Sequence, residues 1–103
     1  MPTALVIGGD GLLGQTLSQY MLALGWRVTR TSRRRFPAAN SVYLDLQVPE
    51  EFIGQYHDIY NPSELVVFIT AAVTGFDRCA RDPIESRRIN VENTAKIACH
   101  FLN

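Results

Sequence analysis

Three glycines near the start of the chain have the spacing of a turn that can hold a phosphate group. Gly8, Gly11 and Gly14 follow an apolar run at residues 4–7 and precede a helical pattern. The first N–H groups of a helix have no partner within it, and the helix dipole is positive at that end, so both favour an anion above the turn. The sequence therefore predicts a pyrophosphate site, with an ordinary strand-to-helix loop as the alternative.

Each of these glycines has its own expected steric role. Gly8 lets the chain turn sharply off the strand, and Gly11 lets the backbone approach a phosphate because no Cβ intervenes. Gly14 lets the helix pack closely on the sheet. The spacing is Gly-x-x-Gly-x-x-Gly, which differs from the older Gly-x-Gly-x-x-Gly dinucleotide fingerprint.

A basic run stands where many dinucleotide-binding folds carry an acidic residue, at the tip of the second strand. Folds that prefer NAD place an Asp or Glu there, roughly twenty residues after the glycines, to bind the ribose hydroxyls. This chain has Ser32, Arg33 and Arg34, followed by a third arginine. A hydroxyl and guanidinium groups would bind a 2′-phosphate through charge-assisted bonds, so the run predicts NADP rather than NAD. The alternative is that these arginines are solvated surface.

Other candidate ligand-binding residues follow predicted strands. Asp45 comes after a short strand and faces the same crevice as the glycine turn. Ala71 and Ala72 end an apolar run at residues 64–72, and their small side chains would leave room for a ligand outside the carboxyl ends of the strands. Alanines that pack beneath a helix are the alternative. Asn90, within a predicted helix, could reach back to the same strand ends.

Alternating strand and helix patterns must position these residues. Apolar or alternating runs predict four strands, at residues 4–7, 26–31, 42–44 and 64–72. Helices are predicted from the glycine turn to Gly25, from Pro49 to between residues 57 and 61, and from Asp82 onward, with a helical turn from Asp77. Parallel strands need right-handed crossovers, so we expect an α/β, Rossmann-type three-layer domain with a four-stranded parallel sheet in the order 3-2-1-4. The strand at residues 64–72 is expected to be central and buried on both faces.

The helical period predicts which face of each helix is buried. The expected stripe of the first helix is Leu13, Leu17, Tyr20, Met21 and Leu24. That of the last helix is Ile84, Val91, Ala95, Ala98 and Leu102, widened by Ile97 and Phe101. One small sheet cannot cover all of the second stripe, so we expect exposed apolar surface and a homo-oligomer.

Composition restricts the class of protein. The 103 residues suit one small domain, residues 1–103, and 47% hydrophobic residues can fill its core. Ten basic and ten acidic residues give a formal net charge of zero, so neither nucleic acid nor an anionic membrane is an expected partner. Cys79 and Cys99 lack metal-ligand spacing and are expected to be small buried residues. With no secretory signal before the first strand, the cytoplasm is the expected compartment.

The order of these motifs resembles the N-terminal half of the extended short-chain dehydrogenase/reductase superfamily. Within it the chain is most similar to the NAD(P)-dependent epimerase/dehydratase group and its dTDP-4-dehydrorhamnose reductase-like branch. The resemblance covers the whole chain and rests on the glycine turn, Thr31-Ser32-Arg33, Asp45-Leu46, Ala71-Ala72, and Asp82-Pro83 followed by residues 89–95. It implies that the parent protein is an NADP-dependent oxidoreductase or epimerase of a nucleotide-activated sugar.

The resemblance also implies which residues bind the dinucleotide. The pyrophosphate would lie on Gly8, Gly11, Leu12 and Leu13, and the 2′-phosphate near Ser32, Arg33 and Arg34. Asp45 and Leu46 would contact the adenine. Ala71, Ala72 and Thr74 would contact the ribose nearer the nicotinamide, and Asn90 would match a family asparagine. The chain departs from the family pattern at Ile7, Ile69 and Asn93, where the family usually has Thr, Asn or His, and Gly.

The family's catalytic pair, Tyr-x-x-x-Lys, does not occur in this sequence. None of Tyr20, Tyr43, Tyr56 or Tyr60 has a lysine four residues later. In the family mechanism the lysine lowers the tyrosine pKa so that the phenol can exchange a proton with the substrate. We therefore assign no catalytic residue and no metal ligand. The chain is either the cofactor-binding piece of a longer enzyme, which we favour, or a complete module that binds a dinucleotide without chemistry.

Overall fold

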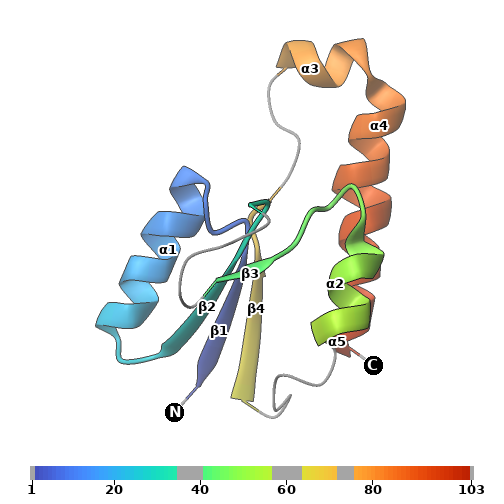
Figure 1. Ribbon diagram of the computed structural model, residues 1–103. Coiled ribbons are helices and arrows are strands. Elements are labelled where there is room, and N and C mark those ends of the chain that lie inside the picture. Colours follow the sequence, from blue (N-terminus) through green and yellow to red (C-terminus); the bar gives the residue numbers. More distant parts are fainter. Residues whose placement is uncertain (1, 35–40, 57–63, 72–75, 103) are drawn as a thin grey trace.

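A computed structural model describes residues 2–34, 41–56, 64–71 and 76–102, which form three layers (Figure 1). The central sheet contains β1 (Thr3–Ile7), β2 (Arg27–Ser32), β3 (Ser41–Tyr43) and β4 (Leu65–Ile69). The helices are α1 (Leu12–Ala23), α2 (Pro49–Tyr56), α3 (Phe76–Arg81), α4 (Pro83–Arg87), the π-helix η2 (Arg88–Asn93) and α5 (Thr94–Leu102). Helix α1 lies on one side of the sheet, and α2 and α5 lie together on the other.

The sheet has the predicted topology. Its strands are all parallel, in the order β3-β2-β1-β4, and Leu5 of β1 is in register with Thr29 of β2 and Val67 of β4. The crossover from β1 to β2 contains α1 and the crossover from β3 to β4 contains α2, and these two helices lie on opposite faces of the sheet. The carboxyl ends of the strands consequently meet at one edge of the sheet, where the glycine turn also lies.

Strand β1, rather than β4, is the central buried strand. Residues 4–7 of β1 have no exposed surface, because β2 and β4 flank the strand and helices cover both faces. Strand β4 is the last in the sheet order, and within the described residues it pairs only with β1. Its side chains are half-buried, with 39% of Val66 exposed. The prediction of a central strand buried on both faces was therefore wrong, because a continuous apolar run does not reveal which strand has two neighbours.

The main hydrophobic core lies between the sheet and the helices α2, η2 and α5. Phe52 of α2 is almost completely buried, and its ring centroid lies 6.2 Å from that of Phe101 in α5. Ile53 of the same helix also packs against the core. The buried cluster consists of Leu5, Ile7, Leu44, Leu46, Phe52, Ile89 and Ile97. The predicted end of α2, between residues 57 and 61, lies outside the described residues.

Helix α1 packs on the sheet through small residues and not through the predicted leucine stripe. Gly14, Ser18 and Met21 are buried, whereas Leu13, Tyr20 and Leu24 are more than half exposed. Gly14 lies so close to the Gly8 carbonyl that the face of α1 that carries Gly14 must point toward the sheet. On the same face, the Ser18 hydroxyl donates to the Gly14 carbonyl at 2.7 Å. The predicted stripe is confirmed at Met21 but was wrong at Leu13, Tyr20 and Leu24, because close backbone packing outweighed side-chain hydrophobicity. Gly25, with φ +87°, ends the helical region as predicted.

The C-terminal helical run packs the predicted positions Ile97 and Phe101 in the core but not the rest of the predicted stripe. Asp82, where this helix was predicted to begin, caps α4, since its carboxylate accepts from the Glu85 N–H at 3.1 Å. Beyond it, η2 interrupts the α-helical period, and the inward positions are Ile89, Asn93, Ile97 and Phe101. Ile84, Val91 and Leu102 of the predicted stripe are exposed. Cys99 is exposed and Cys79 half-buried, so the expected burial of the cysteines was wrong as well.

Candidate functional site

A cleft of about 610 Å³ opens at the carboxyl ends of the strands. Its walls come from the glycine turn, the tips of β2 and β4, the segment after β3, and one residue of η2. The lining residues are Ile7, Gly8, Asp10, Gly11, Leu12, Leu13, Gly14, Thr31, Ser32, Arg33, Leu44, Asp45, Leu46, Gln47, Thr70, Ala71 and Ile89. Among them, the charged side chains are Arg33, Asp10 and Asp45.

The glycine turn has the geometry that its sequence predicted. Gly8 has φ +94°, and a Cβ there would lie 2.6 Å from the backbone nitrogen of Ala71. A Cβ at Gly14 would lie 2.1 Å from the Gly8 carbonyl oxygen, so the helix can approach the turn only without a side chain. A Cβ at Gly11 would meet nothing closer than 3.6 Å. The protein itself therefore leaves the space beside Gly11 open toward the cleft.

The first turn of α1 presents backbone donors to this space. Its N-cap residue is Gly11, and no side chain caps this end of the helix. The N–H groups of the first turn have no partner within a helix and carry its positive dipole end. Leu12 and Leu13 line the cleft with largely exposed side chains, 85% and 66% respectively. An anion with several oxygens, such as a pyrophosphate, fits this arrangement of uncapped donors beside an open glycine.

Hydrogen bonds fix the glycine turn to the neighbouring strands. The Gly8 N–H donates to the Thr31 hydroxyl, and the Gly9 N–H donates to the Thr31 carbonyl, each at 3.0 Å. On the other side, the Thr70 hydroxyl donates to the Ile7 carbonyl at 2.8 Å. The turn is thus held between β2 and β4 before any ligand binds.

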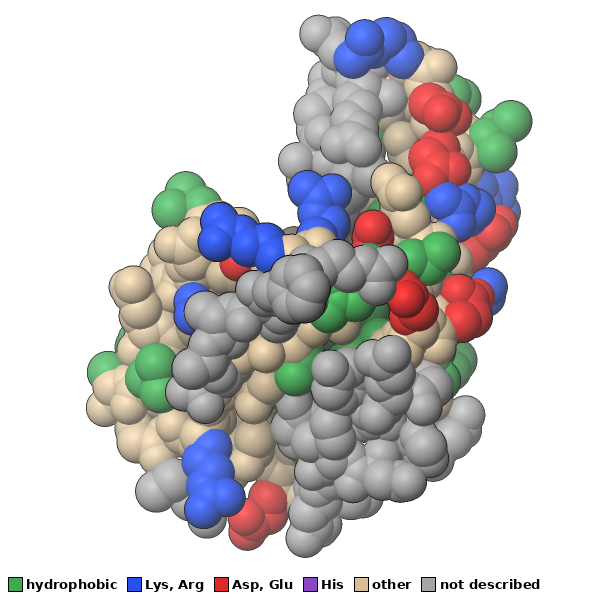
Figure 2. All heavy atoms as spheres, viewed as in Figure 1, with side chains coloured by type: hydrophobic (Ala, Val, Ile, Leu, Met, Phe, Trp, Pro, Cys, Tyr) green, Lys and Arg blue, Asp and Glu red, His purple; other side chains and the backbone are tan. Residues whose placement is uncertain are grey.

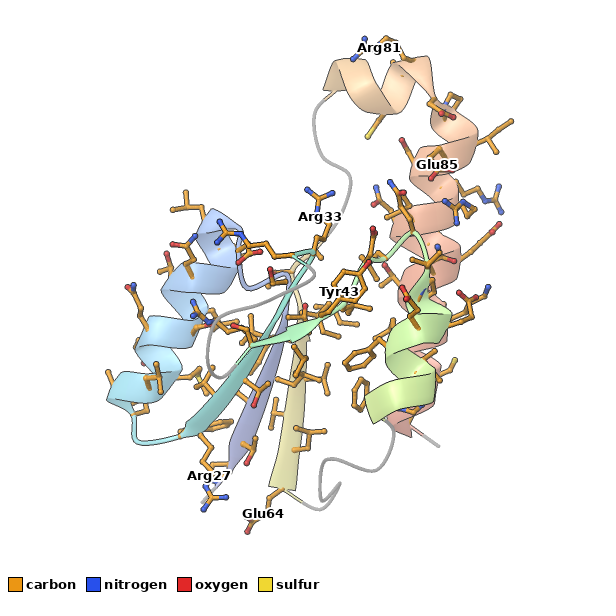
Figure 3. All side chains as sticks on the ribbon, in the orientation of Figure 1. Arg27, Arg33, Tyr43, Glu64, Arg81 and Glu85 are labelled. Atoms are coloured by element: carbon orange, nitrogen blue, oxygen red, sulfur yellow. The ribbon has the colours of Figure 1, made fainter. Side chains whose placement is uncertain are left out.

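The tip of β2 carries a serine and an arginine with different surroundings. Ser32 is buried; its hydroxyl donates to Asp10 Oδ2 at 2.5 Å and accepts from the Arg34 N–H at 3.1 Å. Arg33 is exposed and projects above the strand ends (Figure 3). Figure 2 shows basic side-chain atoms at the surface in this region. The sequence predicted no carboxylate at the tip of β2. The Asp10 carboxylate nevertheless lies beside this tip, because it accepts the hydrogen bond from Ser32.

The segment after β3 forms the opposite wall of the cleft. Asp45 Oδ1 accepts from the Gln47 N–H at 2.9 Å. The carbonyls of Leu46 and Gln47 accept from the side chains of Asn93, at 2.5 Å, and Arg88, at 3.0 Å. Both donors belong to η2, so this helix holds the wall in place. The Glu85 carboxylate, which accepts from Arg88, raises the pKa of the Arg88 guanidinium.

Comparison with known proteins identifies the family. Residues 4–101 match the sequence profile of the NAD dependent epimerase/dehydratase family. The chain belongs to this family. No curated protein matches the chain.

One solved structure with the epimerase/dehydratase arrangement is described as the UDP-glucose 4-epimerase of Thermus thermophilus in complex with NAD. It superposes with a TM-score of 0.77 at 18% sequence identity, over 95% of this chain. The likeness at this identity shows the fold alone. The chain spans 33% of the length of that protein.

Most residues predicted for the dinucleotide site of this epimerase/dehydratase chain line the cleft. They are Gly8, Gly11, Leu12, Leu13, Ser32, Arg33, Asp45, Leu46 and Ala71. Arg34 and Asn90 are not among the lining residues, and from η2 it is Ile89 that lines the cleft. Ala72 and Thr74 lie outside the described residues. Their roles in binding stay predictions.

Sequence reasoning missed several lining residues, of which Asp10, Thr31, Gln47 and Thr70 carry polar side chains. Asp10 occupies a variable position of the glycine turn, and the two threonines lie at strand ends. The signal that could have found the threonines is their place at the ends of β2 and β4, because polar residues there face the crevice. Within the described residues no helix is long and apolar enough to cross a membrane.

Proposed function

We propose that this chain is the dinucleotide-binding part, residues 1–103, of an NADP-dependent oxidoreductase or epimerase that acts on a nucleotide-activated sugar. The observation that carries the proposal is the uncapped first turn of α1, which faces a cleft at the strand ends beside the open Gly11. Membership of the NAD dependent epimerase/dehydratase family supports it. The Thermus structure is a UDP-glucose 4-epimerase in complex with NAD, which supports the same substrate class.

Each wall of the cleft has a role in this proposal. The pyrophosphate approaches the backbone of Gly11 and binds the N–H groups at Leu12 and Leu13, because the Gly11 N–H already donates to the Gly8 carbonyl at 3.1 Å. The adenine lies against Asp45 and Leu46. By resemblance to the family, Ala71, Ala72 and Thr74 contact the ribose nearer the nicotinamide, and Asn90, which does not line the cleft, assists from η2. A bound dinucleotide would supply hydride transfer. The residues of this chain hold and orient it.

The proposed preference for NADP rests on Arg33. Its exposed guanidinium at the cleft can reach a 2′-phosphate, whereas the Ser32 hydroxyl hydrogen is directed at Asp10. One good charge-assisted bond contributes about 1.5–3 kcal/mol, or roughly ten- to hundredfold in affinity. Because Arg33 is exposed, dissolved salt screens this attraction. We expect tighter binding of NADP than of NAD, with a preference that weakens as salt rises.

Calorimetric titration of both dinucleotides at two ionic strengths tests this preference. Arg33→Ala should lower NADP affinity about ten- to hundredfold and leave NAD affinity within about twofold. Arg27→Ala is the matched control, because Arg27 lies at the opposite end of β2 (Figure 3) and its loss removes the same charge away from the cleft. Equal affinities of the unmodified protein for NADP and NAD would contradict the preference.

A second candidate function is a non-catalytic module whose partner binding changes with the dinucleotide. The observation that favours it is the absence of Tyr-x-x-x-Lys from the 103 residues. The reading frame of the source gene after residue 103 discriminates between the two. A downstream Ser or Thr followed by Tyr-x-x-x-Lys supports the enzyme, and a stop codon supports the regulatory module.

A further inference from the structure

Asp10 has no role in the function proposed above, although its carboxylate lies inside the same cleft. It accepts the Ser32 hydroxyl at 2.5 Å, across 22 residues of sequence. A hydroxyl has one hydrogen to donate, and the Ser32 oxygen already accepts from the Arg34 N–H at 3.1 Å. Ser32 therefore cannot donate to a ligand phosphate without giving up Asp10.

The backbone fixes Asp10 at the tip of β2. Parallel pairing places Val6 opposite Arg30, and the N–H groups of Gly8 and Gly9 bond to the side chain and the carbonyl of Thr31. A Cβ at Gly9 would lie 2.5 Å from the Cβ of Arg30, so the turn contacts the strand closely one residue before Asp10. The glycine turn thus supplies a carboxylate to a strand tip that has none of its own.

The cleft then holds opposite charges near the β2 tip. Arg33, exposed above the strand, attracts a 2′-phosphate. The Asp10 carboxylate repels a phosphate dianion but accepts hydrogen bonds from a ribose diol. Selectivity is a difference between two affinities, and a repulsive group lowers one of them as effectively as an attractive group raises the other.

We propose that Asp10 is a specificity-determining residue, which weakens binding of a 2′-phosphorylated dinucleotide and strengthens binding of one with a free ribose diol. The proposal rests on the dinucleotide-binding function above. Asp10 opposes Arg33, so the preference for NADP is smaller than Arg33 alone would give. The acidic group comes from the glycine turn and not from the strand tip.

Asp10→Asn tests this role, because asparagine keeps the side-chain size and an oxygen that can accept the Ser32 hydroxyl. Calorimetric titration should show NADP affinity rising about tenfold and NAD affinity falling about threefold. The rise in NADP affinity should persist in an Arg33→Ala background, because the repulsion does not need the arginine. Asp10→Ser serves as a second neutral variant if the first unfolds, and thermal unfolding checks each protein.

Glu92→Gln is the matched control, since it removes one exposed negative charge from a residue that does not line the cleft. It should change neither affinity by more than about twofold. If Asp10→Asn and Asp10→Ser move both affinities in the same direction, or move neither, the proposal for Asp10 is wrong. If the unmodified protein binds neither dinucleotide, the proposed function itself fails, and this inference fails with it.

Discussion

Gly11 and Gly14 lie one helical turn apart, yet a methyl group at each position should have a different effect. In Gly14→Ala the new Cβ would lie 2.1 Å from the Gly8 carbonyl oxygen, so the backbone must shift. We expect this variant to lose about 1–3 kcal/mol of unfolding free energy. Gly11→Ala places its Cβ in open space at φ −76°, which alanine readily adopts. It should change stability by less than about 1 kcal/mol and lower dinucleotide affinity about tenfold or more.

Urea denaturation measures the first effect, and calorimetric titration of NADP and NAD measures the second. The two variants serve as controls for each other, because both add one methyl group to the same turn. A stable Gly14→Ala protein would mean that the helix can move away from the turn without cost. Unchanged affinity in Gly11→Ala would mean that the phosphate does not approach this residue.

At the residue scale, the sequence predicted the role of those residues that depends only on their place in a local turn. The positive φ of Gly8 and the close packing of Gly14 follow from their place between a strand and a helix. Asp10 could not be found in this way, because its contact with Ser32 requires the register between β1 and β2. Likewise, the sequence did not show that Ile89 of η2 lines the cleft, whereas Asn90 is not among its lining residues.

At the element scale, η2 supports one wall of the cleft. Asn93 is buried and donates to the Leu46 carbonyl at 2.5 Å. Asn93→Ala leaves that buried acceptor without this donor, and we expect a loss of about 1–3 kcal/mol of unfolding free energy. Urea denaturation of both proteins measures the loss.

Val91→Ala provides the comparison, because Val91 is exposed on the same helix and should matter by less than about 0.5 kcal/mol. Equal stabilities of Asn93→Ala and the unmodified protein would show that the Asn93 bond adds nothing to the folded state. A destabilised Asn93→Ala protein should also bind dinucleotide less tightly, since Leu46 lines the cleft.

Strands and helices were predictable as elements, but the faces that the helices bury were predicted only in part, at Met21, Ile97 and Phe101. Apolar runs identified all four strands, and parallel crossovers then led to their order. The predictions of the buried helix faces were wrong at several positions, for two physical reasons. Gly14 turns α1 so that Gly14, Ser18 and Met21 face the sheet, and η2 changes the period of the last helical run. Neither a close backbone contact nor a π-helical turn leaves a hydrophobic pattern in the sequence.

At the scale of the whole molecule, large apolar side chains remain on the surface. Ile84 and Leu102 are more than 80% exposed, and Val91 and Tyr20 more than half. We predict that the 103-residue protein self-associates at high micromolar concentration, because such surface is seldom left in contact with water. Light scattering should report a mass above that of the monomer, and Leu102→Glu should lower it. A monomeric mass at that concentration would contradict the prediction.

The position of β4 along the chain determines when the cleft can exist during synthesis. Strand β1 pairs with β2, which ends at Ser32, and with β4, which begins only at Leu65. At about 5–20 residues per second, a ribosome needs roughly 2–7 seconds to add the intervening residues. During that interval one edge of the most buried strand has no neighbour, and the Thr70 hydroxyl cannot yet bond to Ile7. A nascent chain therefore has its glycine turn before it has the tip of β4, which completes the cleft beside that turn.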